Sequence, residues 1–143
     1  MVKLIPGKKG SGKTKLLIEA IKTARNESKG NVVAVQIGSS LNSSVHYSVR
    51  LINVEDYKIG NYKNQNNEIE GYDAMFGFIG GILASDYDCT HIFVDGILRI
   101  AGRDLSKIGE MLGKIEKVSG ETVVTLTISA DADGLPPEVK KYC

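Results

Sequence analysis

The sequence predicts an α/β protein with three layers, in which a mainly parallel sheet of about five strands is flanked by helices on both sides. Short runs of branched apolar residues alternate with longer segments whose apolar residues repeat at helical spacing. Those short runs lack the polar alternation of a half-exposed sheet, which favours strands buried on both faces. We therefore expect one doubly wound domain over 1–143, with the first strand at the centre of the sheet.

The first half of the chain predicts three strands and one helix. An apolar run over 2–5 predicts the first strand, and apolar residues at helical spacing predict a helix over 13–29. Branched residues predict further strands over 32–37 and 49–54. The segment 58–70 is polar and rich in asparagine, so we expect a mobile surface loop there.

The second half continues the same alternation. Helical spacing of apolar residues predicts helices over 72–85 and 104–119. Apolar runs predict strands over 91–94 and 121–130. Two consecutive prolines near the end of the chain, at 136–137, predict one short helical turn.

Three glycines lie inside the predicted helix over 72–85, namely Gly77, Gly80 and Gly81. Each helix-interior glycine costs about 1 kcal/mol relative to alanine, so their presence needs a reason. Close approach of another backbone is the simplest one. Packing against the protein's own sheet and packing against a second copy of the chain explain the glycines equally well.

The most specific motif is a glycine-rich stretch between the first strand and the first helix. It satisfies the pattern G-x-x-x-x-G-K-[ST], which this composition yields by chance roughly 0.02 times. Glycines let the backbone curl until its amides point inward and form a nest for anions, and the helix N-terminus adds positive charge. The stretch consists of Gly7, Lys8, Lys9, Gly10, Ser11, Gly12, Lys13 and Thr14.

Two side chains of this stretch have predicted roles. Lys13 is expected to reach the β- and γ-phosphates of a nucleotide, where it also acts on the phosphate being transferred, and Thr14 is expected to bind Mg²⁺ through its hydroxyl. A second candidate metal ligand is Asp95, which follows the apolar strand over 91–94. In nucleotide-binding proteins an acidic residue at that point holds the magnesium ion near the phosphates.

The stretch over 7–14 and the strand ending at Asp95 resemble the Walker A and Walker B motifs of the P-loop NTPase superfamily. Together with Ser129-Ala130-Asp131, they also resemble small stand-alone bacterial ATP-binding proteins that are sometimes labelled twitching-motility-like. The resemblance implies a P-loop fold, binding of ATP or another nucleoside triphosphate, and Mg²⁺ as cofactor. Motors of the twitching-motility type are much longer, so that function is not carried over.

The residue after Asp95 departs from the superfamily pattern. Many of its ATPases carry a glutamate there, which polarises the attacking water, whereas this chain has Gly96. Asp131 and Asp133 follow the last strand and are candidate catalytic residues, although a polar turn explains them as well. We therefore expect slow or partner-dependent hydrolysis. A small phosphotransferase and a non-catalytic nucleotide-dependent interaction module are the alternatives.

Other polar residues near the motifs have two explanations each. Thr125, Thr127 and Ser129 alternate on the last strand, which suits either a sensor of the γ-phosphate or a half-exposed or edge strand. Arg99 and Arg103 follow Asp95 and are expected either to stabilise a transferring phosphate or, as is more common, to cap helices and meet solvent.

The composition limits the class of partner. A net charge of +1 with only four arginines does not support nucleic-acid binding. Two cysteines without metal-ligand spacing favour a cytoplasmic setting, and no apolar run is long enough to span a membrane. We expect an unidentified protein partner besides the nucleotide, and self-association through the glycine-containing helix is an open alternative.

Overall fold

The structure, a computed structural model, describes residues 1–59 and 71–143. Its strands are β1 (Val2–Pro6), β2 (Asn31–Gln36), β3 (Arg50–Asn53), β4 (Cys89–Val94) and β5 (Val123–Ile128). Its helices are α1 (Lys13–Glu27), α2 (Gly71–Ser85), α3 (Ile97–Ile100), α4 (Leu105–Ser119) and α5 (Pro137–Lys140), with 3-10 turns η1 (Val54–Tyr57) and η2 (Ala132–Gly134). Each predicted strand and long helix is present within a few residues of its expected bounds.

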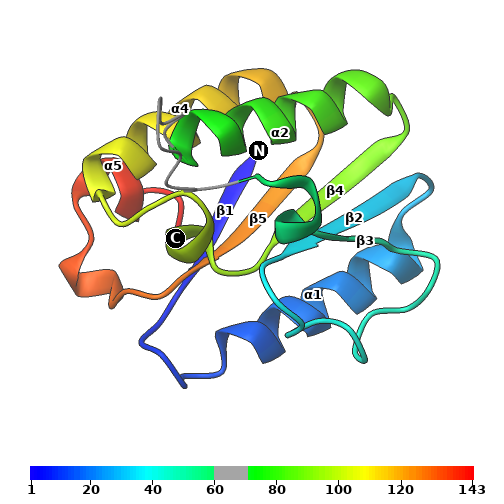
Figure 1. The fold of residues 1–143 in the computed structure, drawn as a ribbon, viewed down its shortest axis with the longest axis horizontal. Helices are drawn as coiled ribbons and strands as arrows, with labels where there is room; N and C mark the ends of the chain where they lie inside the picture. Colours follow the sequence, from blue (N-terminus) through cyan, green and yellow to red (C-terminus); the bar gives the residue numbers. More distant parts are fainter. Residues whose placement is uncertain (60–70) are drawn as a thin grey trace.

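The strands form one parallel sheet in the order β1-β5-β4-β2-β3, shown in Figure 1. The prediction that the first strand lies at the centre is wrong, because β1 is at the edge. The last strand, β5, is inserted between β1 and β4, pairing Leu4 with Leu126 and Ile92 with Val124. The place of β5 between β1 and β4 depends on packing between distant parts of the chain. The order of the strands in the sequence does not specify it.

The free edge of β1 is closed to further strands by its own chain. The backbone N–H of Val2 donates to Oε2 of Glu116 over 2.6 Å, and the N–H of Leu4 donates to the carbonyl of Tyr142 over 2.8 Å. Pro6 has no N–H to offer. Because these backbone N–H groups are already bonded or absent, the edge of β1 is a poor template for another strand, and the sheet ends there.

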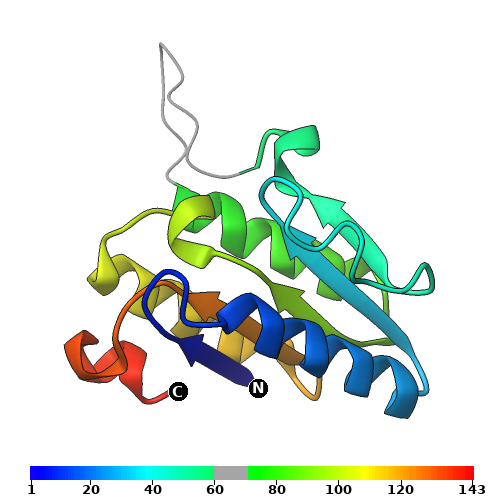
Figure 2. The ribbon, with the colours of Figure 1, turned by 90° about the horizontal axis from the view of Figure 1, so that it is seen from below.

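The sheet separates two apolar layers of unequal size. Figure 2 shows α1 alone on one face, while α2 and α4 cover the other. In β2, Val33 and Val35 enter the larger layer with α2 and α4, whereas Val32 and Ala34 enter the smaller layer with α1. Successive strand residues point to opposite faces. The middle of β2 is therefore apolar at four consecutive positions, as the sequence predicts.

The three glycines of α2 do not have the role that was predicted for them. A Cβ placed on Gly77, Gly80 or Gly81 meets no described atom within 4 Å beyond its own surroundings on the helix. The prediction of a close approach by another backbone is therefore wrong within the described chain. Burial of α2 depends on Met75 and Ile79, which lie on the opposite side of the helix and are fully buried.

Two further predictions concern the periphery. Of the predicted mobile loop 58–70, residues 60–70 lie outside the described residues. Among the residues that the structure describes, no helix has the length and apolar character needed to cross a membrane.

Candidate functional site

The loops that follow four of the strands meet at one edge of the sheet. Because all strands run parallel, the loops after β1, β2, β4 and β5 open on the same side. A cavity of about 670 Å³ lies there. Its lining includes Lys13, Thr14, Ser40, Asp95, Arg99 and Thr127. Side chains that are far apart in the sequence are thus brought together by topology alone.

The 7–14 loop, defined as residues 7–14, curls between β1 and α1. Gly10 and Gly12 have φ angles of 82° and 91°, in the left-handed region that side chains rarely adopt. The N–H of Gly7 ties the start of the loop to the carbonyl of Ala130, and within the loop the N–H of Ser11 donates to the carbonyl of Lys8, each over 3.0 Å. Glycine at these positions is therefore required by the curl.

The N-terminus of α1 points into this loop without a side-chain cap. Gly12 precedes the helix and supplies no capping side chain, and the first turn contains no acidic residue. The first amides of a helix need acceptors, and the helix dipole favours negative charge there. A 15-residue helix that begins without either is suited to an external anion such as a phosphate.

Lys13, the first residue of α1, is held inside the loop. Its side chain is buried, and Nζ donates to the carbonyl oxygen of Lys8 over 3.0 Å. The cationic head is therefore held by the backbone of the loop, at the cavity that Asp95 also lines. This places a positive charge where the sequence motif predicts contact with phosphate.

Three hydroxyl groups surround the carboxylate of Asp95. Thr127 Oγ1 donates to Oδ1 over 2.7 Å, and Ser40 Oγ donates to Oδ2 over 2.9 Å. Thr14 Oγ1 lies 3.3 Å from Oδ2 and 3.4 Å from Oδ1. Asp95 is 8% exposed, and these contacts fix the orientation of its carboxylate. The two predicted metal ligands, Thr14 and Asp95, are therefore neighbours in space.

Sequence reasoning found two of these three hydroxyl groups. Ser40 was missed, because a serine in the loop after β2 carries no motif. For Thr127 the sequence predicts either a sensor of the γ-phosphate or a place on a half-exposed or edge strand. The second explanation is wrong, since β5 is an inner strand and Thr125 and Thr127 are buried. The buried hydroxyl of Thr127 has its hydrogen-bond partner in Asp95.

The oxygens of Thr14 and Asp95 suit a metal ion that takes most of its ligands from phosphate and water. Within the described ranges, no group of three or more histidine, cysteine or acidic side chains is arranged to hold a metal. Mg²⁺ in nucleotide sites commonly uses one or two protein oxygens, with phosphate oxygens and waters completing the octahedron. Thr14 and Asp95 fit that role and do not form a cage of their own.

Asp131 and Asp133 lie at the rim of the site. The carboxylate of Asp131 is 3.9 Å from Nζ of Lys8, and both side chains are more than half exposed. Asp131 also caps η2 by accepting from the N–H of Asp133 over 3.4 Å. The last strand does lie beside the first, as their predicted role requires. Their catalytic role stays a prediction, because neither lines the cavity around Asp95.

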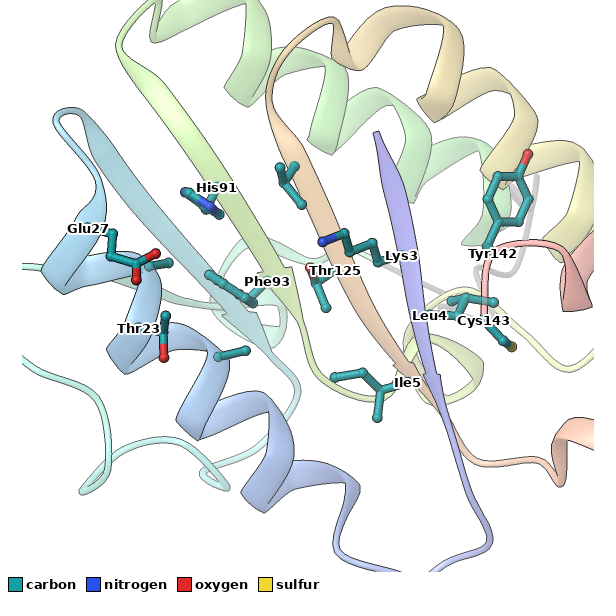
Figure 3. Close-up of a pocket in the computed structure, with 13 residues that line it drawn as sticks. Lys3, Leu4, Ile5, Thr23, Glu27, His91, Phe93, Thr125, Tyr142 and Cys143 are labelled. Atoms are coloured by element: carbon teal, nitrogen blue, oxygen red, sulfur yellow. The ribbon is translucent and has the colours of Figure 1, made fainter.

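A second cavity, of about 580 Å³, lies between α1 and the face of the sheet formed by β1, β5 and β4 (Figure 3). His91 and Phe93 of β4, Lys3 of β1 and Glu27 of α1 line it, and the rings of His91 and Phe93 are stacked 4° from parallel. Burial, with a smaller effect of the Lys3 charge, lowers the pKa of His91. This cavity carries one basic and one acidic side chain, Lys3 and Glu27, whereas the cavity beside the 7–14 loop is lined mainly by basic ones.

Comparison with known proteins supports the fold and nothing finer. No family model matches the chain. No curated protein matches it either. Among solved structures, C. elegans PCH-2 is similar, with a TM-score of 0.53 and 16% sequence identity. The match covers 99% of this chain and 33% of PCH-2, so this chain spans about a third of its length. The three-layer α/β architecture is thus shared with a larger protein.

Proposed function

We propose that this chain binds ATP, or another nucleoside triphosphate, together with Mg²⁺ at the 7–14 loop. One observation carries the proposal: the curled loop, the buried Lys13 and the Thr14–Asp95 pair converge on a single cavity. The loop amides and the N-terminus of α1 suit the phosphates, and Lys13 suits the β- and γ-oxygens. Bound Mg²⁺ would neutralise phosphate charge, with Thr14 and Asp95 as its protein contacts.

We further propose that hydrolysis is slow or depends on a partner. Gly96 occupies the position where many related ATPases carry the glutamate that activates water. Its φ of 84° disfavours any side chain, so the missing carboxylate is not supplied by a small change at this position. The other acidic candidates, Asp131 and Asp133, do not line the cavity that holds Asp95. This arrangement favours binding of the nucleotide over its rapid hydrolysis.

Calorimetric titration with ATP and Mg²⁺ tests the binding proposal. Lys13→Ala is expected to weaken binding about 10- to 100-fold, because it removes the buried cation that faces the phosphates. Lys22→Ala is the matched control, since it removes the same charge from the exposed side of the same helix. Equal affinity in wild type and Lys13→Ala, or no binding by the wild type, would contradict the proposal.

A single-turnover assay tests the hydrolysis proposal separately. We expect a rate below about 0.1 s⁻¹ for the isolated protein, whereas typical enzymes run at about 1 s⁻¹ or faster. Turnover at an ordinary enzymatic rate without any partner would show that the protein is a self-sufficient ATPase.

A further inference from the structure

The segment 96–104, called the platform below, follows Asp95 and is anchored at both ends. Ile97 and Ile100 of α3 are buried to 0% and 1% exposure, so the turn is held from beneath by apolar packing. Gly102, with a φ of 136°, lies against the ring of Tyr72. The hydroxyl of Tyr72 then accepts the N–H of Asp104 over 2.8 Å. Both ends of the segment are therefore fixed, one to β4 and the other to α2.

Two arginines are the exposed members of this platform that face the site. Arg99 and Arg103 line the same cavity as Lys13 and Asp95. Both are exposed, and the structure gives neither guanidinium a hydrogen bond or ion pair within the described part of the chain. Two permanent positive charges thus border the site, on a rigid support and without a carboxylate partner.

The position of Arg99 is tied to the glycine after Asp95. A Cβ on Gly96 would contact Cδ and Cβ of Arg99 at 3.7 and 3.9 Å. The stem of Arg99 therefore lies over the residue where related ATPases carry their water-activating glutamate. Arg99 also lines the cavity that holds Lys13, the residue that we expect to contact the terminal phosphates. In this chain the group presented there is cationic.

We propose that Arg99 and Arg103 bind the γ-phosphate, so that this chain distinguishes nucleoside triphosphates from diphosphates by its own residues. The inference rests on the proposed function and adds its specificity. A guanidinium presents a planar fork of donors that matches phosphate oxygens, and such charge-assisted hydrogen bonds are stronger than neutral ones. A diphosphate lacks the group that these arginines contact and gains nothing from them.

Competition titrations with ATP and ADP, each with Mg²⁺, test this specificity. Arg99→Gln and Arg103→Gln are each expected to lower ATP affinity about tenfold while changing ADP affinity by less than about twofold. Arg99→Lys and Arg103→Lys keep the charge and are expected to fall between wild type and the glutamine variants. Arg50→Gln on β3 is the matched control, since Arg50 is exposed and contacts Tyr57 instead of the cavity.

The outcomes separate this inference from the proposed function. If the glutamine variants lose ATP and ADP affinity equally, or lose neither, the arginines do not read the γ-phosphate and the inference fails alone. If wild type binds neither nucleotide, both proposals fail. Circular dichroism melting of each variant checks that the platform is still folded, which we expect because both side chains project from its surface.

Discussion

At the scale of single residues, the site depends on the orientation of one carboxylate. Asp95 is held by hydroxyl groups from three different segments, which belong to α1, the loop after β2, and β5. Thr127 does more than the others, because its oxygen also accepts the N–H of Gly96 over 2.7 Å. The buried hydroxyl of Thr127 therefore connects β5 to Asp95, the candidate metal ligand, and to Gly96, the first residue of the platform.

Thr127→Val should lower the free energy of unfolding by about 1 to 3 kcal/mol. Valine keeps the shape of threonine, but it leaves the Gly96 N–H without its acceptor and Asp95 without one donor in a buried setting. Urea denaturation measures the change. Thr125→Val is the matched control, since Thr125 is buried on the same strand and contacts neither group. Equal effects of the two substitutions would show that the hydroxyl bonds of Thr127 contribute nothing specific.

At the scale of elements, the sequence predicted what depends on local periodicity. The 15-residue helices α1, α2 and α4 each show apolar residues at helical spacing, and the buried strands show runs of branched residues. The four-residue α3 was not predicted, because a single turn is too short to show a period. Its importance comes from what it packs on and presents, which only the folded chain reveals.

The candidate site divides in the same way. The 7–14 loop, Lys13, Thr14 and Asp95 were predictable because their spacing reflects a fixed chemistry along the chain. Ser40 was not, since its only signal is its distance to Asp95. The choice between the two roles of Thr127 also required the strand order, because an edge strand and an inner strand give the same alternation.

The glycines of α2 supply a test at this scale. Gly77→Ala and Gly81→Ala should each raise the free energy of unfolding by about 0.5 to 1 kcal/mol, because alanine suits a helix and its Cβ enters open space. Thermal or urea unfolding gives the value. Gly120→Ala is the contrasting control: space is equally open there, but its φ of 56° penalises a side chain. Destabilisation by the α2 substitutions would mean that another surface covers this helix.

At the scale of the whole molecule, the parallel sheet makes one of its ends chemically different from the other. The carboxyl ends of the strands carry the loops, hydroxyl groups and cations of the candidate site. Away from those ends, Lys3, His91 and Thr125 place further polar side chains on the face that the sheet shares with α1. Of these three residues, His91 makes stability depend on pH in a defined direction.

Stability should fall as the pH drops below about 6.5, in part because of His91. Its pKa is lowered in the folded state, mainly by burial, so the folded protein favours the neutral ring. The unfolded chain, with a pKa of about 6.5, binds the proton more readily. Stability from this group is therefore fully present above that value and is lost as the pH falls toward the lower folded pKa.

Urea unfolding across this range, for wild type and His91→Gln, isolates the contribution of the ring. The variant should lose less stability on acidification than the wild type, since it has no ring to protonate. Parallel pH profiles for the two proteins would show that His91 titrates alike in both states.

The central claim is that the 7–14 loop holds the phosphates of a nucleotide. A crystal structure with a non-hydrolysable ATP analogue and Mg²⁺ tests it most directly. The account predicts the triphosphate within the curl of the 7–14 loop, with Lys13 on its terminal phosphates and the metal ion beside Thr14 and Asp95. An analogue bound in the cavity of His91 and Lys3, or phosphates lying away from the loop, would contradict it.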